Sequence, residues 1–185
     1  MKIGLAVGHS RQGDEGAMTT RESGYSISEF MFNSDLVRRI APNLTMDYVI
    51  YDDYKDPTYV GAIDYLAQKL IADEVDAVVE LHFNSATPQA EGHEWLYWHA
   101  SKGGSKLAYA LKEEMQKAYP DMKSRGAKPR AAKQRGSYFL RKVRPIAVIA
   151  EPFFGSNCEE WMMINNNRGK LAGVYARALN KFADG

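Results

Sequence analysis

The sequence predicts a single α/β domain in three layers, with a mostly parallel, twisted sheet between helices on both faces. Short apolar segments alternate with segments of ten or more residues whose apolar side chains have helical spacing, which is the pattern of βαβ units. The chain has 185 residues, a length typical of one domain. Because no internal repeat and no Pro/Ser-rich linker divides the chain, residues 1–185 are expected to form one domain.

The segments predicted to be strands are short and dominated by Val, Ile, Leu, Ala and aromatic residues. They are residues 2–8, 46–51, 77–82, 94–98 and 145–150. The last of these, PIAVIA, is apolar throughout and is expected to be buried.

The segments predicted to be helices follow or separate these strands. They are residues 28–40, 60–72, 104–119 and 167–182. Ser28 is suited to cap the first helix, and Pro42 ends it. Pro120 closes the third helix in the same way.

Composition excludes several classes of protein. The 24 Lys and Arg against 23 Asp and Glu leave a formal charge of +1, so no nucleic acid is expected as partner. No run of about 18 apolar residues exists, so we expect no membrane span. The N-terminal apolar run is short and ends at Gly8-His9, unlike a signal peptide. We therefore expect the protein to be cytoplasmic at first. The single cysteine, Cys158, excludes an intramolecular disulfide and Cys-based zinc clusters.

The segment 123–144 is strongly basic, with nine Lys or Arg and no acidic residue. It is interpreted either as a solvated loop or as a patch for an anionic polymer or an anionic substrate group.

Polar residues follow the predicted strands at the points where the strands end. His9 follows the first strand, His82 and Asn84 follow the strand that ends near Leu81, and Glu151 follows PIAVIA. Ligands in open α/β sheets bind outside the carboxyl ends of the strands, so these side chains are expected at one edge. Glu29 lies in the first turn of the first helix.

Two imidazoles and a carboxylate, without cysteine, fit a catalytic zinc site, which usually has three protein ligands and an open position for water. His9, Glu29 and His82 are the candidate ligands. Glu151 is the candidate proton shuttle.

Several motifs, in order along residues 3 to 180, resemble the zinc-dependent N-acetylmuramoyl-L-alanine amidases (amidase type 3). The motifs are AVGHS at 6–10, DEGA at 14–17, SEFMFN at 28–33, LHFNSA at 81–86, GHEWLYW at 92–98 and PIAVIAEPFFGSN at 145–157.

The resemblance implies a catalytic domain that hydrolyses peptidoglycan at the amide between N-acetylmuramic acid and L-alanine. It implies that His9, Glu29 and His82 bind Zn²⁺ and that Glu151 is the catalytic carboxylate. Asn84 and Asn157 lie within its motifs and are expected to contact the substrate.

One departure from the family pattern concerns the ligand glutamate. In the family it usually lies closer behind the Gly-Ala pair than Glu29 does, so Glu22 is a competing candidate. Glu29 is preferred because it heads a helix and is followed by Phe32-Asn33, as in similar amidases.

Another departure from the family pattern concerns Glu80. The family more often has a small polar residue there, and residues 80 and 82 face the same side of a strand. Glu80 could therefore orient an imidazole, or it could be exposed at a sheet edge. His93 and His99 flank the segment EWLYW, and surface or groove positions are favoured over a pair of metal ligands.

The alternatives to a wall amidase are an amidohydrolase of small N-acyl amino acids and a non-catalytic wall-binding protein. A compact amidase without an export signal and without a wall-anchoring module resembles a phage endolysin. We therefore expect a monomer that remains in the cytoplasm of its host cell until it is released to the wall for lysis.

Overall fold

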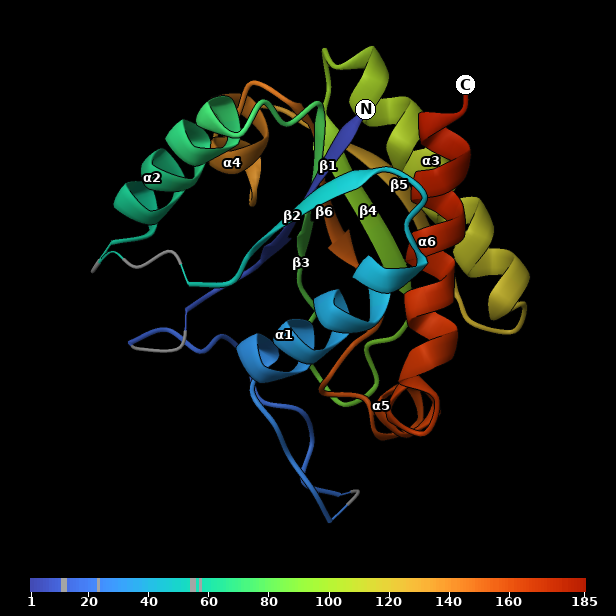
Figure 1. Ribbon diagram of the computed structural model, residues 1–185. Helices are drawn as coiled ribbons and strands as arrows, with labels where there is room; N and C mark the ends of the chain where they lie inside the picture. The colour runs from blue at the N-terminus through green and yellow to red at the C-terminus, as the bar shows by residue number, and fades with distance from the viewer. Residues whose placement is uncertain (11–12, 23, 54–55, 57) are drawn as a thin grey trace.

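Six strands form one mixed sheet in the order β2-β1-β3-β6-β4-β5. The structure is a computed structural model that describes residues 1–185 except 11–12, 23, 54–55 and 57 (Figure 1). The strands are β1 (Lys2–Val7), β2 (Asp47–Tyr51), β3 (Ala77–Leu81), β4 (His93–Trp98), β5 (Ser124–Arg130) and β6 (Ile146–Glu151). The helices are α1 (Glu29–Ile40), the short 3₁₀ helix η1 (Ala41–Asn43), α2 (Tyr59–Ala72), α3 (Lys102–Ala118), α4 (Ser137–Lys142), α5 (Cys158–Asn165) and α6 (Arg168–Ala183).

The strand directions divide the sheet into two parts. Strands β2, β1, β3 and β6 are parallel to one another. Strand β4 is antiparallel to β6, and β5 is parallel to β4. The predicted mostly parallel sheet is therefore confirmed, with two strands at one side that run in the opposite direction.

Helices cover both faces, which confirms the predicted three layers. Figure 1 shows α2 and α4 on one side of the sheet and α3 and α6 on the other. In β1, Ile3, Leu5 and Val7 pack into the larger core, which also contains side chains from α1, α3, α5 and α6. Ala6 points to the other face and joins the smaller core with α2 and α4. This alternation follows from the two-residue repeat of a strand.

The helices α1, α2, α3, α5 and α6 begin where a side chain caps their free N–H groups. The Ser28 hydroxyl accepts a hydrogen bond from the N–H of Met31 at 3.3 Å, which confirms the predicted cap of α1. Thr58 and Ser101 cap α2 and α3 in the same way. None of the helices in the described part of the chain combines the length and the apolarity needed to cross a bilayer.

The basic segment 123–144 is not a loop, because it contains β5 and α4. Strand β5 lies at the edge of the sheet, where Pro129 is tolerated because an edge strand leaves some N–H groups unpaired. Its Lys, Arg and Gly residues leave too few apolar side chains to form the alternating pattern by which strands are recognised. The helix α5 was also not predicted, because it is only eight residues long.

The sheet brings the ends of four strands to one edge. The N–H of Gly8 donates to the carbonyl of Leu81 at 2.9 Å, and the N–H of His82 donates to that of Ala150 at 3.0 Å. The residues that follow β1 therefore lie beside the end of β3, and those that follow β3 lie beside the end of β6. Because β4 is antiparallel to β6, the start of β4 lies at this edge as well, with Glu94 opposite Glu151.

Candidate metal centre

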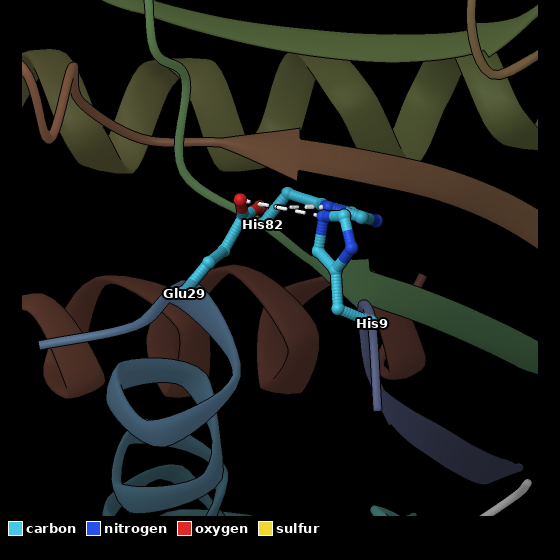
Figure 2. Close-up of side chains that lie close together, drawn as sticks. All are labelled: His9, Glu29 and His82. Atoms are coloured by element: carbon cyan, nitrogen blue, oxygen red, sulfur yellow. Dashed lines mark hydrogen bonds and ion pairs between the residues drawn. The ribbon is translucent and has the colours of Figure 1, made fainter. Parts of the chain in front are cut away.

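His9, Glu29 and His82 converge at the carboxyl ends of β1 and β3 and the start of α1, as Figure 2 shows. Each offers one ligand atom, and these atoms all lie within 4.8 Å of one another. Glu29 Oε2 is 3.3 Å from His9 Nε2, and Glu29 Oε1 is 2.8 Å from His82 Nδ1. The structure thus joins three residues that lie far apart in the sequence.

Two backbone amides fix the Glu29 carboxylate between the imidazoles. The N–H of Phe83 donates to Oε1 at 3.0 Å, and the N–H of Ala17 donates to Oε2 at 3.2 Å. Glu29 is 3% exposed. Glu22 is exposed in a loop, so the geometry favours Glu29 over Glu22 as a ligand.

Glycines beside the site make room for its side chains. A Cβ atom on Gly8 would lie 2.2 Å from Cε1 of the His82 ring. A Cβ atom on Gly16 would lie 2.6 Å from Cδ2 of His9, and Gly16 also has a φ of +75°. Glycine is therefore required in the sequence motifs AVGHS and DEGA because any larger residue would overlap an imidazole ring.

Each imidazole has a second carboxylate on its other nitrogen. His9 Nδ1 lies 3.1 Å from Asp14 Oδ1, and His82 Nε2 lies 3.4 Å from Glu80 Oε2. Glu80 is 3% exposed, so it is not at an exposed sheet edge. Carboxylates in this position orient metal-binding imidazoles and fix their tautomers. Asp14 follows His9 by five residues, but no motif in the sequence singles it out.

The carboxylates also change the acidity of the cluster. Burial would lower the pKa of His82 and of His9, but hydrogen bonds to Glu29 and to their second carboxylates outweigh it and raise both pKa values. Burial would raise the pKa of Glu29, but the two imidazoles hold that pKa well below its usual value. Without a metal ion the two imidazoles therefore bind protons more tightly than an isolated histidine does, and an incoming cation competes with protons for the nitrogens that it binds.

Glu151 is the last residue of β6 and is 1% exposed. Its Oε1 accepts a hydrogen bond from Arg135 Nη2 at 2.9 Å. Its Oε2 is buried and has no hydrogen-bond partner in the described part of the chain. Burial raises the pKa of Glu151 to about 7, and the positive charges of His82 and Arg135 limit the rise. A carboxyl group that titrates near neutral pH is suited to both accept and donate a proton.

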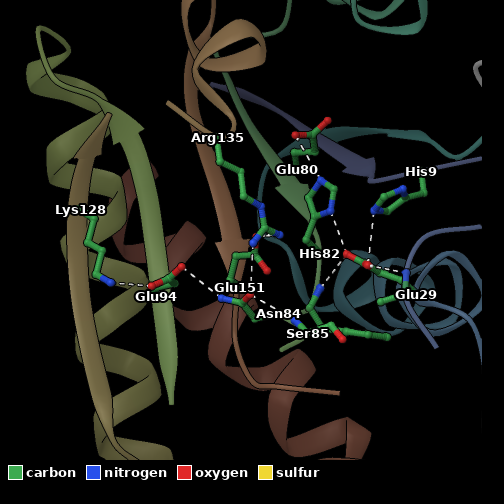
Figure 3. Close-up of polar contacts among 12 residues, drawn as sticks. His9, Glu29, Glu80, His82, Asn84, Ser85, Glu94, Lys128, Arg135 and Glu151 are labelled. Atoms are coloured by element: carbon green, nitrogen blue, oxygen red, sulfur yellow. Dashed lines mark hydrogen bonds and ion pairs between the residues drawn. The ribbon is translucent and has the colours of Figure 1, made fainter. Parts of the chain in front are cut away.

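A polar network continues from Glu151 across the sheet, as Figure 3 shows. Arg135 Nη1 donates to Asn84 Oδ1 at 3.2 Å, and Asn84 Nδ2 donates to Glu94 Oε1 at 3.1 Å. Glu94 Oε2 accepts from Lys128 Nζ at 2.6 Å. Asn84 is 5% exposed, so its amide holds this network in place. Its predicted contact with substrate stays a prediction.

Sequence reasoning missed Arg135 and Glu94. Arg135 belongs to the basic segment that was considered only as a whole. Glu94 reaches the site because β4 is antiparallel to β6, which no short pattern in the sequence indicates.

Two other polar residues have structural positions. Asn157 caps α5, where its Oδ1 accepts from the N–H of Glu160 at 3.0 Å, and its Nδ2 donates to the carbonyl of Ala90 at 3.2 Å. Both the oxygen and the nitrogen of this side-chain amide thus have partners within the chain, and the predicted contact with substrate gains no support. His93 is fully buried, so the expected surface or groove position was wrong. It accepts a hydrogen bond from the Trp95 indole at 2.9 Å.

Two adjoining cavities open onto the cluster. One, of about 440 Å³, is lined by residues that include Glu151, Arg135 and Lys133. The other, of about 180 Å³, is lined on one side by Asp14. Both are also lined by His9 and His82, so the cluster lies where the two cavities meet. A long substrate could therefore extend to either side of it.

Comparison with known families identifies the fold. The family model Amidase_3, described as N-acetylmuramoyl-L-alanine amidase, matches residues 3–181. The chain belongs to this family. Its members hydrolyse the amide that joins the glycan of peptidoglycan to its peptide, and this chain is accordingly an N-acetylmuramoyl-L-alanine amidase.

Solved structures share the fold at low sequence identity. The CwlD amidase from Clostridioides difficile, solved in complex with the GerS lipoprotein, has a TM-score of 0.84 and 19% identity over 99% of this chain and 98% of that chain. The amidase AmiC2 of Nostoc punctiforme has a TM-score of 0.81 and 20% identity over 100% and 98% of the two chains. The catalytic domain of the CD27L endolysin targeting Clostridia Difficile has a TM-score of 0.74 and 22% identity over 100% and 97%. A search of curated protein sequences finds no match.

Proposed function

We propose that this amidase is zinc-dependent and that His9, Glu29 and His82 hold the ion. The proposal is supported by the donor set, since two imidazoles and one carboxylate are ligands that Zn²⁺ accepts and their ligand atoms lie within 4.8 Å of one another. The carboxylates of Asp14 and Glu80 would orient the two rings. This outer pair is characteristic of histidines that bind metals.

A bound zinc ion would make water nucleophilic near neutral pH and would polarise the substrate carbonyl. The remaining work falls to Glu151. Its buried Oε2, which has no hydrogen-bond partner among the described residues, would accept the proton of the attacking water. The same carboxyl group would then donate that proton to the nitrogen of L-alanine as the amide bond breaks.

The single observation that carries this mechanism is the position of Glu151 beside the cluster. Strands β3 and β6 are neighbours. The backbone N–H of His82 donates a hydrogen bond at 3.0 Å to the carbonyl of Ala150, the residue before Glu151. The carboxyl group therefore shares one edge of the sheet with the proposed ligands, and it lines the same cavity as His9 and His82.

The test combines metal analysis with mass spectrometry of digested peptidoglycan. We expect about one zinc ion per chain and a new amine on L-alanine, with an intact lactyl group on the sugar. Small N-acyl amino acids are tested as competing substrates. Cleavage of these alone, or a new amine elsewhere in the peptide, would refute the proposed substrate.

The variant Glu151→Gln separates metal binding from chemistry. It keeps the size of the side chain but cannot carry the proton, so we expect turnover to fall about 10²- to 10⁴-fold while zinc stays bound. The matched control is Glu113→Gln on the exposed side of α3. Lysis of purified walls by Glu151→Gln at the rate of the unaltered enzyme would discard the assignment.

We further propose that the enzyme acts as a monomer, since the proposed metal ligands and Glu151 meet without a contribution from a second copy, and that it causes lysis once it is released from the cytoplasm to the wall. Sedimentation would test the first point. For the second, expression with and without a membrane-permeabilising protein should give lysis only when that protein is present.

A further inference from the structure

Arg135 and Glu151 form an uneven ion pair beside the larger cavity. The Glu151 side chain is 2% exposed, whereas that of Arg135 is 64% exposed. Arg135 uses Nη2 for Glu151 and Nη1 for Asn84, whereas a guanidinium has five N–H groups to donate. The arginine therefore faces the cavity with donors that can bind a second acceptor.

The chain holds Arg135 at this place with a tight turn between β5 and α4. The N–H of Ala131 donates to the Gln134 side chain at 2.8 Å, and the N–H of Ser137 donates to the Gln134 carbonyl at 3.0 Å. Gly136 has a φ of +76°, and a Cβ atom there would lie 2.5 Å from Ile149. The turn therefore depends on a glycine directly after the arginine.

The other acidic group of the network is already neutralised. Glu94 Oε2 accepts hydrogen bonds from Lys128 Nζ at 2.6 Å and from Arg125 Nε at 3.2 Å. This leaves Glu151 as the acidic partner of Arg135, and the proposed mechanism requires Glu151 to gain and lose a proton. An anionic group of the substrate at this place would give Arg135 a permanent charged partner during that cycle.

The substrate carries such a group close to the bond that is cut. In the stem peptide, L-alanine is followed by a D-glutamyl residue that is linked through its side chain, so that its α-carboxylate is either free or amidated. A residue spans roughly 3.5 Å of extended chain. The α-carboxylate thus lies between one and two residue lengths from the nitrogen that Glu151 would protonate, within reach of an exposed arginine beside Glu151.

We infer that Arg135 binds the free α-carboxylate of the second stem residue and makes the enzyme select stems in which that carboxylate is not amidated. The inference rests on the proposed function, since it assumes that Glu151 lies next to the L-alanine nitrogen. It assigns Arg135 to substrate selection rather than to chemistry.

The experiment measures kcat and KM on two muramoyl peptides that differ only in a D-glutamate or a D-isoglutamine at the second position. The zinc-loaded enzyme is compared with Arg135→Gln and Arg135→Lys. The control is Arg144→Gln, which removes the same charge at an exposed position beside a separate cavity lined by Leu70 and Val75.

The unaltered enzyme and Arg144→Gln are expected to favour the free carboxylate about 10- to 100-fold in kcat/KM, mainly through KM, as for a hydrogen bond to a charged group. In Arg135→Gln the ratio should fall to near one, with partial recovery in Arg135→Lys. If the unaltered enzyme shows no preference between the two peptides, that result alone overturns the inference. An equal loss on both peptides in Arg135→Gln would also overturn it, because the arginine would then act only through Glu151. If the unaltered enzyme cleaves neither peptide, the proposed function fails and the inference falls with it.

Discussion

Glu80 Oε2 lies 3.4 Å from Nε2 of His82, on the side of the imidazole ring away from Glu29. Both residues are on the same face of the chain as it leaves β3, because they are two positions apart. The buried carboxylate can thus accept the N–H of the nitrogen that does not face the cluster. This leaves Nδ1 as the nitrogen that faces Glu29 and the proposed ion.

Replacing Glu80 by Gln should weaken zinc binding. The amide can accept the same hydrogen bond but without the charge that makes the imidazole a better ligand, so we expect the Kd for zinc to rise about 10- to 100-fold. Competition with a chromogenic chelator measures it. Glu113→Gln is the control, and an unchanged Kd in Glu80→Gln would show that Glu80 does not support the ligand.

Removing the metal should destabilise the protein through mass action. With free zinc at 1,000 times its Kd, binding contributes about 4 kcal/mol, so a chelator should lower the Tm of the unaltered protein. His9→Ala and His82→Ala should each contain less zinc and respond less to the chelator. Equal metal content in both variants and the unaltered protein would rule out this site.

The acidity of Glu151 predicts how stability depends on pH in metal-free protein. Its pKa is about 7 when folded and near 4.5 when unfolded, so the folded state retains a proton that the unfolded state has lost between these values. The contribution of Glu151 to the free energy of unfolding therefore falls as the pH rises from about 4.5 to about 7. Glu151→Gln escapes this loss and should be more stable than the unaltered protein above pH 7, by about 3 kcal/mol.

Urea unfolding at pH 5 and pH 8 in the presence of a chelator measures this difference. The advantage of Glu151→Gln should be small at pH 5 and reach its full value at pH 8. A difference that stays constant between the two pH values would mean that Glu151 is not held neutral by burial.

A methyl group on Gly8 should displace His82 while leaving the fold intact. The added Cβ would lie 2.2 Å from the imidazole, and the ring would have to move out of line with Glu29. We expect Gly8→Ala to lose most of its zinc and to keep its far-UV circular dichroism spectrum. In the control Gly169→Ala, the nearest atom lies 3.7 Å away, and zinc content should not change. Full zinc occupancy in Gly8→Ala would mean that the ring position is not critical.

Much of the fold could be predicted because strands and helices carry periodic apolar patterns. Residues 77–82 and 28–40 correspond closely to β3 and α1, and Ser28 caps α1 as expected. Strand β5 could not be predicted, because an edge strand needs few apolar residues and its cations lie over polar partners such as Glu94. The direction of β4 depends on which strand it pairs with, and this is a property of the whole sheet.

The apolar runs of the sequence identify the side chains at the ends of β1, β3 and β6, because a buried apolar run that stops at His or Glu marks the carboxyl edge of a parallel sheet. The folded chain was needed to favour Glu29 over Glu22, to bring Asp14 and Glu80 to the imidazoles, and to place Arg135 against Glu151. The difference arises because strand periodicity is a local property of the chain. Contacts between carboxylates and their partners depend on how loops and antiparallel strands return to the same edge of the sheet. The spacing of residues over a short stretch of sequence does not predict this.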